Sequence, residues 1–124
     1  MMRERALVAV VDDDESVREA LPDLVRELGH EAEAYSSAED FLASSRIDQT
    51  RCLVLDIAMP GMTGLDLQRV LAARGKNIPI VFITAHGDET VRRHLKERGA
   101  VDCLVKPFSD TALQEAINEA LNPK

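Results

Sequence analysis

Residues 6–14 read ALVAVVDDD, and this segment gives the strongest indication of the fold. Six apolar residues, rich in valine, are followed without a break by three aspartates. An apolar run of this length with no polar alternation is typical of a strand that is buried on both faces. The run therefore predicts a central strand of a parallel sheet, with carboxylates at the end of that strand.

Three later runs have nearly the same apolar character and also lead into a polar side chain. A fifth candidate strand, from Glu31 to Tyr35, alternates acidic and apolar residues, which is typical of a half-exposed edge strand. The three apolar runs are CLVL at residues 52–55 before Asp56, IPIVFI at residues 78–83 before Thr84, and VDCLV at residues 101–105 before Lys106.

Helical patterns separate these runs. Between residues 17 and 28, apolar side chains recur at helix spacing and stop before Gly29, a residue type common just past a helix end. Ser37 and Thr63 are each followed three residues later by an aspartate, which is the spacing of a capping box. These signatures predict the first three helices.

The last two helices differ in their apolar content. The stripe from Leu113 to Leu121 predicts a well-anchored final helix. The fourth helix, expected between Asp88 and Arg98, has Val91 and Leu95 as its only large apolar residues. A helix with so thin an apolar stripe is expected to be weakly held.

The resulting order is a strict alternation of five strands and five helices. Such alternation predicts an α/β fold, a doubly wound parallel sheet with right-handed crossovers that place helices on both faces. At 124 residues the chain is expected to form one domain spanning residues 1–124, with residues 122–124 as the start of a linker.

Charge and composition exclude several classes of protein. The formal net charge of -7 argues against direct nucleic-acid binding, which depends on Lys and Arg. No apolar run approaches the roughly 18 residues of a membrane span, so a cytoplasmic protein is expected. Cys52 and Cys103 lack a CxxC or metal-ligand spacing, and we interpret them as buried thiols.

The polar residues that follow the strands predict the chemistry. Because the carboxyl ends of parallel strands meet at one edge of a sheet, carboxylates after two strands should lie near a hydroxyl and an ammonium group. Mg2+ suits such a cluster, since it binds carboxylates, waters and phosphate oxygens. The set indicates phosphoryl transfer to a carboxylate, and its members are Asp12, Asp13, Asp56, Thr84 and Lys106.

Four segments, in order and spacing, resemble the response-regulator receiver family of two-component signalling, and most of all its FixJ-type branch of transcriptional regulators. The resemblance implies a flavodoxin-like (βα)5 sheet with strand order 2-1-3-4-5. The segments are VAVVDDDESVR at residues 8–18, LVLDIAMPGMTGLDL at 53–67, IVFITAHGD at 80–88 and LVKPFSD at 104–110.

The resemblance also implies the roles of the site residues. Asp56 would be the phosphoacceptor, and Asp12 and Asp13 the acidic pair that binds Mg2+ together with it, with Asp13 the more direct ligand. The backbone carbonyl of Ala58 would complete the protein's share of the metal ligands.

Residues after the fourth and fifth strands would contact the phosphoryl group. Thr84 would bond a phosphoryl oxygen and Lys106 would form an ion pair, aimed by a cis peptide bond before Pro107. His86 occupies a position that in this family can influence loss of the phosphoryl group, although a loop residue without such a role fits equally well.

The family also implies a switch and its partners. A sensor histidine kinase would donate the phosphoryl group, and a surface on the fourth helix, fifth strand and fifth helix would then control an output domain, transcription, a partner protein or homodimer formation. The chain would be no enzyme beyond its own phosphorylation and dephosphorylation. It departs from the family at Cys103, three residues before Lys106, where a switching Tyr or Phe is usual.

Three rival functions fit the residues less well. A phosphatase of the haloacid dehalogenase type needs a second aspartate two residues after the nucleophile, where this chain has Ala58. A dinucleotide-binding half-domain needs a GxGxxG turn where residues 12–14 are aspartates. A pseudo-receiver, which binds partners without accepting phosphate, usually lacks one of the groups that this chain retains.

Overall fold

A parallel sheet forms the centre of the computed structural model, which describes residues 5–87 and 89–122. Within those residues the sheet has five strands in the order β2-β1-β3-β4-β5, and every neighbouring pair is parallel. The predicted strand order is therefore confirmed. The strands are β1 (Leu7–Val11), β2 (Glu31–Tyr35), β3 (Thr50–Asp56), β4 (Ile80–Thr84) and β5 (Asp102–Val105).

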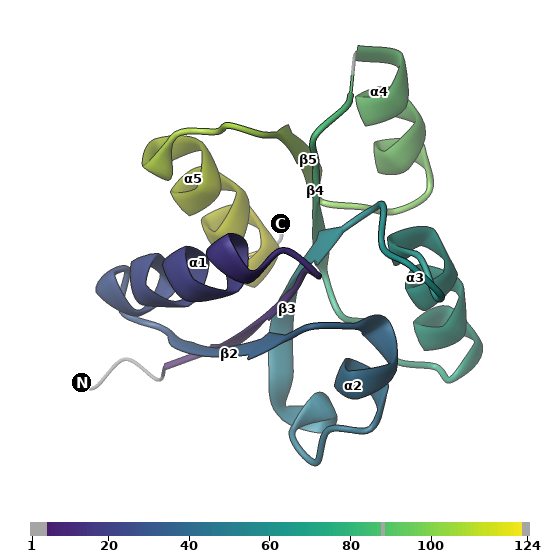
Figure 1. The fold of residues 1–124 in the computed structure, drawn as a ribbon, viewed down its shortest axis with the longest axis horizontal. Coiled ribbons are helices and arrows are strands. Elements are labelled where there is room, and N and C mark those ends of the chain that lie inside the picture. The colour runs from purple at the N-terminus through teal and green to yellow at the C-terminus, as the bar shows by residue number, and fades with distance from the viewer. Residues whose placement is uncertain (1–4, 88, 123–124) are drawn as a thin grey trace.

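Helices cover both faces of this sheet, as expected of a doubly wound fold. Figure 1 shows α1 and α5 on one face and α2, α3 and α4 on the other. A short 3-10 helix, η1 (Ile47–Gln49), leads into β3 and was not predicted. The helices are α1 (Glu15–Glu27), α2 (Ala38–Leu42), α3 (Gly64–Ala73), α4 (Glu89–Glu97) and α5 (Asp110–Leu121).

The predicted helix signals act as caps. Thr63 and Asp66 form a complete capping box at the start of α3. The Ser37 hydroxyl accepts the N–H of Asp40 at the start of α2, which is only five residues long. Gly29 follows α1 with a positive φ of 97°, a conformation that glycine adopts at little cost. The expected boundaries at Asp88 and at residues 123–124 lie outside the described residues.

Two apolar cores lie on the two faces of the sheet. Alternate residues of β1 and β3 point to opposite faces, so both strands are buried on both sides. Cys52 belongs to the core beneath α1 and α5, and Cys103 to the core beneath α2, α3 and α4. Both are buried free thiols, as predicted, and they lie on opposite sides of the sheet.

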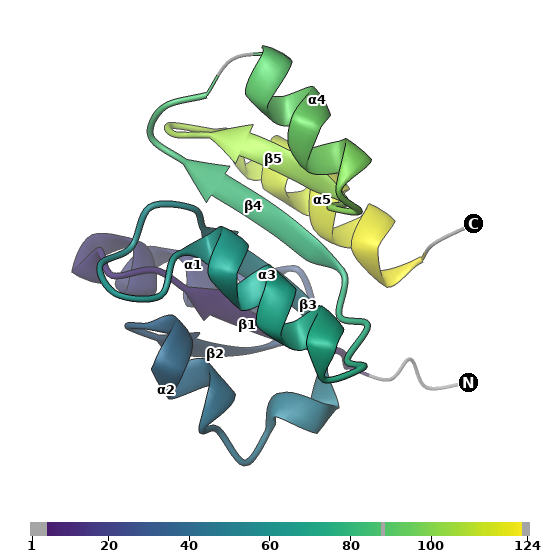
Figure 2. The same ribbon diagram turned by 90° about the vertical axis from the view of Figure 1, so that its right-hand side faces the viewer.

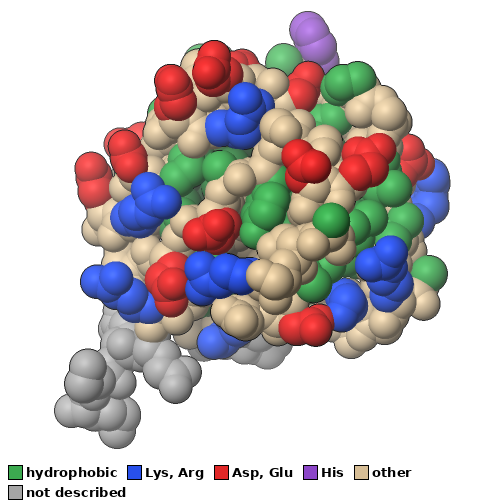
Figure 3. Space-filling model, turned by 60° about the horizontal axis from the view of Figure 1, so that its bottom comes forward, with side chains coloured by type: hydrophobic (Ala, Val, Ile, Leu, Met, Phe, Trp, Pro, Cys, Tyr) green, Lys and Arg blue, Asp and Glu red, His purple; other side chains and the backbone are tan. Residues whose placement is uncertain are grey.

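The outer surface carries charges of both signs. On the face in Figure 3, acidic and basic side chains are interspersed, with apolar side chains visible between them. In the part of the chain that the structure describes, none of the helices has the length and apolar character needed to cross a membrane.

Candidate functional site

The carboxyl ends of four strands deliver the predicted site residues to one edge of the sheet. Asp12 follows directly after β1, and Lys106 follows directly after β5. Asp56 and Thr84 are the last residues of β3 and β4, so each of these strands extends one residue past the carboxyl end of its apolar run. Three of these side chains, those of Asp12, Asp56 and Thr84, are buried.

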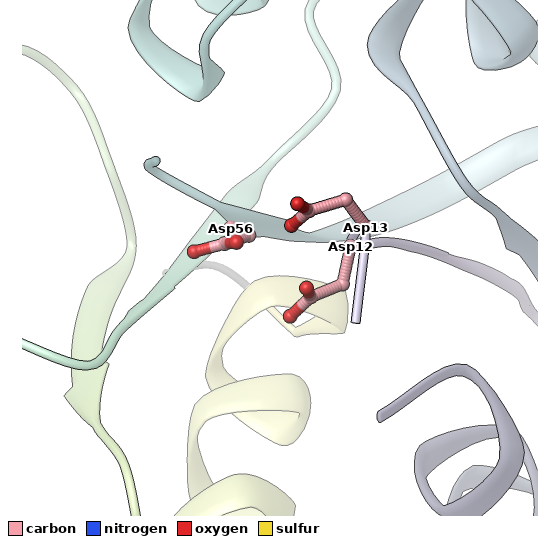
Figure 4. Close-up of side chains that lie close together, drawn as sticks. All are labelled: Asp12, Asp13 and Asp56. Atoms are coloured by element: carbon pink, nitrogen blue, oxygen red, sulfur yellow. The ribbon is translucent and has the colours of Figure 1, made fainter. Parts of the chain in front are cut away.

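Three carboxylates meet at this edge. In Figure 4 the side chains of Asp12 and Asp13 extend from the end of β1 toward Asp56. One carboxylate oxygen from each of the three lies within 4.8 Å of the others. Asp13 is exposed, whereas the other two are buried. Hard oxygen ligands at this spacing fit a divalent cation such as Mg2+, with the open side at Asp13 left for water or phosphate oxygens.

Asp12 is held at every polar atom. Its N–H donates to the carbonyl of Tyr35 at 3.1 Å, and its own carbonyl accepts Nη1 of Arg18 at 3.1 Å. Its Oδ1 accepts the N–H of Asp14 at 2.9 Å, and its Oδ2 accepts Nζ of Lys106 at 3.0 Å. The orientation of this carboxylate is therefore set by the protein before any ion binds.

Asp56 has an unusual protonation equilibrium. Burial and the neighbouring charge of Asp12 raise the pKa of Asp56 from 3.8 to about 6, although Lys106 acts to lower it. A weak hydrogen bond from the N–H of Ala58, at 3.4 Å, supports one carboxylate oxygen. The ionised form of Asp56 is thus less stable than that of an ordinary aspartate, and the positive charge of a bound dication would stabilise it.

Lys106 is the cation of the cluster. Burial acts to lower the pKa of Lys106, but the hydrogen bond to Asp12 and the charges of Asp12 and Asp56 outweigh burial and raise it. The peptide bond between Lys106 and Pro107 is cis, as predicted. The ammonium group reaches Asp12 from the opposite end of the chain, 94 residues away.

Thr84 lies at the site with its hydroxyl turned to its own loop. The hydroxyl donates to the carbonyl of His86 at 2.9 Å and accepts the N–H of His86 at 3.1 Å. The side chain of His86 is exposed. The structure therefore links the two residues through the backbone of His86 rather than through its imidazole.

Cys103 lies in β5 next to an aromatic side chain. It is buried in register with Phe82 of β4, and both belong to the same apolar core. Burial raises the pKa of its thiol, followed by the effect of the nearby Asp102. The thiol is thus a packed apolar group, and Phe82 provides the aromatic ring in this part of the core.

Two residues that were not predicted from the sequence, Gly64 and Arg18, also shape the site. Gly64 begins α3 so close to β3 that a Cβ atom there would lie 2.4 Å from the carbonyl oxygen of Asp56. Only glycine allows this approach. The position of Gly64 within residues 53–67, a segment that resembles the family, could have indicated that it matters to the site. Arg18 closes segment 8–18, but nothing in a linear pattern indicates that it reaches the Asp12 carbonyl.

Comparison with known proteins identifies related sequences. Residues 8–118 match the model of the response regulator receiver domain family. Nodulation protein W of Bradyrhizobium diazoefficiens is 47% identical over 113 residues, which cover 91% of this chain and 50% of that protein. Response regulator protein TodT of Pseudomonas putida is 45% identical over 121 residues, covering 97% and 53%. The chain thus spans about half the length of these curated relatives.

Solved structures show the same fold. The structure of response regulator StyR superimposes with a TM-score of 0.85 at 48% identity, covering 95% of this chain and 60% of that one. The crystal structure of FixJ-N superimposes with a TM-score of 0.84 at 38% identity, covering 98% of both chains.

Proposed function

The chain belongs to the response regulator receiver domain family, the phosphorylation switches of two-component signalling, and we propose that its phosphoacceptor is Asp56. The observation that supports this assignment is a buried carboxylate with a raised pKa, set among two further carboxylates. Above pH 6 it is an ionised oxygen nucleophile, and the ammonium group of Lys106, whose charge lowers its pKa, is hydrogen-bonded to Asp12. A carboxylate in this state is suited to attack phosphorus once a cation is present.

The transfer makes one bond and breaks another. An oxygen of Asp56 attacks the phosphorus of a phosphohistidine on a sensor histidine kinase, and the P–N bond breaks as the P–O bond forms. The kinase histidine leaves with its electron pair and takes up a proton. The product is an aspartyl phosphate, and Lys106, now bonded to Asp12, would pair with one of its oxygens.

Asp12, Asp13, Asp56 and the carbonyl of Ala58 are the proposed Mg2+ ligands. When bound, the ion would neutralise the phosphoryl oxygens and the carboxylates together. Asp13 is the exposed member of the cluster, in keeping with a direct ligand. Asp12 is already oriented by protein donors, so it would orient the ion with little rearrangement.

The phosphoryl group would also draw in Thr84. A group with about two negative charges and three acceptor oxygens needs donors on the side opposite the metal. The Thr84 hydroxyl would exchange the carbonyl of His86 for a phosphoryl oxygen. We propose that the domain also catalyses its own dephosphorylation, in which the phosphoryl group is hydrolysed and the resting state returns. His86 is a candidate to influence the rate of this hydrolysis.

The output is proposed to pass through the surface formed by α4, β5 and α5. Relatives include proteins named transcriptional regulatory proteins, TdiR of Thauera aromatica and FixJ of Rhizobium meliloti, and this chain spans about half of each. We propose that residues 1–124 form one cytoplasmic receiver domain, with a linker beginning at residues 122–124. Phosphorylation would control transcription through an output domain, a partner protein or a homodimer.

Labelling with acetyl phosphate tests the acceptor. Intact-protein mass spectrometry should show one phosphoryl group on the wild type in the presence of Mg2+, and the adduct should be acid-stable and base-labile. Asp56→Asn should show none. Asp14→Asn is the matched control, because Asn caps a helix as well as Asp and the residue lies at the same edge. Equal labelling of Asp56→Asn and the wild type would refute the assignment, and an unlabelled wild type would make the chain a binding module.

The metal ligands are tested by Mg2+ titration. Asp13→Ala and Asp12→Ala should weaken Mg2+ binding and slow labelling, because each removes a carboxylate from a hard dication. Lys106→Ala should bind Mg2+ at least as tightly as the wild type, because it removes a competing cation from Asp12. Complete loss of Mg2+ binding in Lys106→Ala alone would contradict these roles.

A further inference from the structure

Polar contacts hold α4 where apolar contacts are few. Of the residues described in α4, Leu95 alone is buried, and Val91 has 37% of its surface exposed. Arg92 compensates with a fork: its Nε lies 2.9 Å from Oδ1 of Asp102 and its Nη2 lies 3.2 Å from Oδ2. A bidentate pair of this kind fixes both distance and orientation, which a single apolar contact does not. The hydrogen bond raises the pKa of the Arg92 guanidinium.

The other half of the fork is anchored in the sheet. Asp102 opens the edge strand β5, and only 14% of its side-chain surface is exposed. Its Oδ1 also accepts the N–H of Cys103 at 2.7 Å, and Nζ of Lys96 lies 3.8 Å away. Asp102 is therefore held by the strand, and Arg92 connects a thinly packed helix to it. Figure 2 shows α4 lying across β5 on the face opposite α5.

Residues 86 and 87, which precede α4 in the chain, contact Thr84. The Thr84 hydroxyl is bonded to His86, and α4 begins at Glu89. A Cβ atom on Gly87 would lie 3.0 Å from Cγ2 of Thr84 and 3.2 Å from Cγ2 of Val105. The backbone at Gly87 is thus packed directly against the threonine methyl, so a displacement of Thr84 changes the contacts of residues 86 and 87 as well.

We propose that Arg92 and Asp102 are positioning residues, whose fork holds α4, and through the loop Thr84, in the resting arrangement. This inference rests on the proposed phosphorylation of Asp56. In that reaction the phosphoryl group draws Thr84 away from His86, and we expect residues 86 and 87 and the start of α4 to shift with it; Arg92 lies one turn from the beginning of α4. The fork opposes that shift, so weakening it should increase the population of the activated arrangement.

The test measures the sign of an affinity change. Beryllofluoride with Mg2+ serves as the probe for the phosphoryl group, and amide resonances report its half-saturating concentration. Arg92→Gln should bind beryllofluoride about fivefold more tightly than the wild type, which is the upper range for a partly exposed pair. Arg93→Gln removes the same charge from an exposed neighbouring residue of α4 and should leave the affinity unchanged.

A merely structural contact would give the opposite result. Loss of ordinary packing would lower thermal stability and leave beryllofluoride affinity equal or weaker, and that outcome in Arg92→Gln would overturn the proposal. Arg92→Lys should fall between wild type and Arg92→Gln, because an ammonium group cannot form the fork. Asp102→Asn should match Arg92→Gln, because it removes the charge while its amide oxygen still accepts the N–H of Cys103.

Hydrogen exchange without any phosphoryl analogue separates the two proposals. In Arg92→Gln, amides of α4 should exchange about fivefold faster than in the wild type, while those of β3 stay unchanged. Unchanged exchange in α4 would refute the fork as a restraint. A wild type that binds no beryllofluoride and takes no label on Asp56 would refute the proposed function, whereas normal labelling with an unaffected Arg92→Gln would refute only the fork.

Discussion

The two helices that flank the edge strand β5 are held in different ways. α5 buries four side chains against the sheet, and α4 buries one of those described. Burial of apolar surface is non-directional and persists when neighbouring atoms shift slightly. The hydrogen bonds of a bidentate ion pair are directional, and a small displacement weakens them. α5 therefore belongs to the rigid frame, whereas α4 can change position at low cost. The four residues that α5 buries are Leu113, Ala116, Ile117 and Ala120.

The carboxyl edge of the sheet resembles α4 more than α5. Its contacts are hydrogen bonds and charges, among them Lys106 to Asp12 and Thr84 to His86. These contacts respond to a new charge, whereas the core beneath α1 and α5 offers no charged group to respond. The frame therefore stabilises the fold, whereas the carboxyl edge is the region whose contacts change when a charge is added.

The largest expected effect comes from the frame. Ile117→Ala removes a fully buried side chain of α5 and should lower the free energy of unfolding by about 4 kcal/mol. Urea unfolding measures the loss. Labelling of the folded fraction by acetyl phosphate should keep its wild-type rate. A variant that keeps its stability but loses labelling would contradict the assignment of α5 to the frame.

The corresponding truncation in α4 should cost less. Leu95→Ala should lower the free energy of unfolding by about 2 kcal/mol, because the helix can detach locally before the sheet unfolds. Hydrogen exchange should rise in α4 and stay low in β3. If Leu95→Ala and Ile117→Ala gave equal losses with uniform exchange, the contrast between the helices would be wrong.

The acidic edge should destabilise the metal-free chain at neutral pH. Because the pKa of Asp56 is raised to about 6, the folded state retains a proton that the unfolded chain loses near pH 3.8. The stability contributed by that proton is present below about pH 4 and is lost as the pH rises through 6.

Asp56→Asn removes this dependence. Without Mg2+, the variant should be more stable than the wild type by about 1 to 2 kcal/mol at pH 8, and the difference should disappear near pH 4. Urea unfolding at several pH values gives both curves. Saturating Mg2+ should shrink the difference at pH 8, and a wild type that is the more stable of the two without Mg2+ would refute the raised pKa.

The smallest expected effect is at Cys103. An aromatic residue here would add area that is buried in one arrangement and exposed in the other, but the thiol is small and already packed beside Phe82. Cys103→Ala should cost about 1 kcal/mol of stability and leave labelling and the beryllofluoride response nearly unchanged. Sedimentation with and without beryllofluoride checks this. Normal labelling with a lost response would make Cys103 part of the relay.

The order of the helices and strands, and the residues of the polar edge, follow from the pattern of residues along the chain. Short apolar runs between helical patterns predict strands, and the residue after each run is placed at the carboxyl edge by the direction of a parallel strand. The caps at Ser37 and Thr63 and the thin stripe of α4 are equally local, because they depend on helix periodicity and neighbouring backbone groups.

The contacts between distant residues could not be predicted in this way, because they depend on how the elements pack. The pairing of Lys106 with Asp12 spans 94 residues, and the raised pKa of Asp56 arises from burial and a charge on another strand. The Arg92 fork likewise depends on how closely α4 lies over β5. Sequence periodicity specifies directions along a helix or strand. Distances between elements follow from how all the side chains pack together. Those distances determine the pKa values, the hydrogen bonds and the ion pairs of the site and of α4.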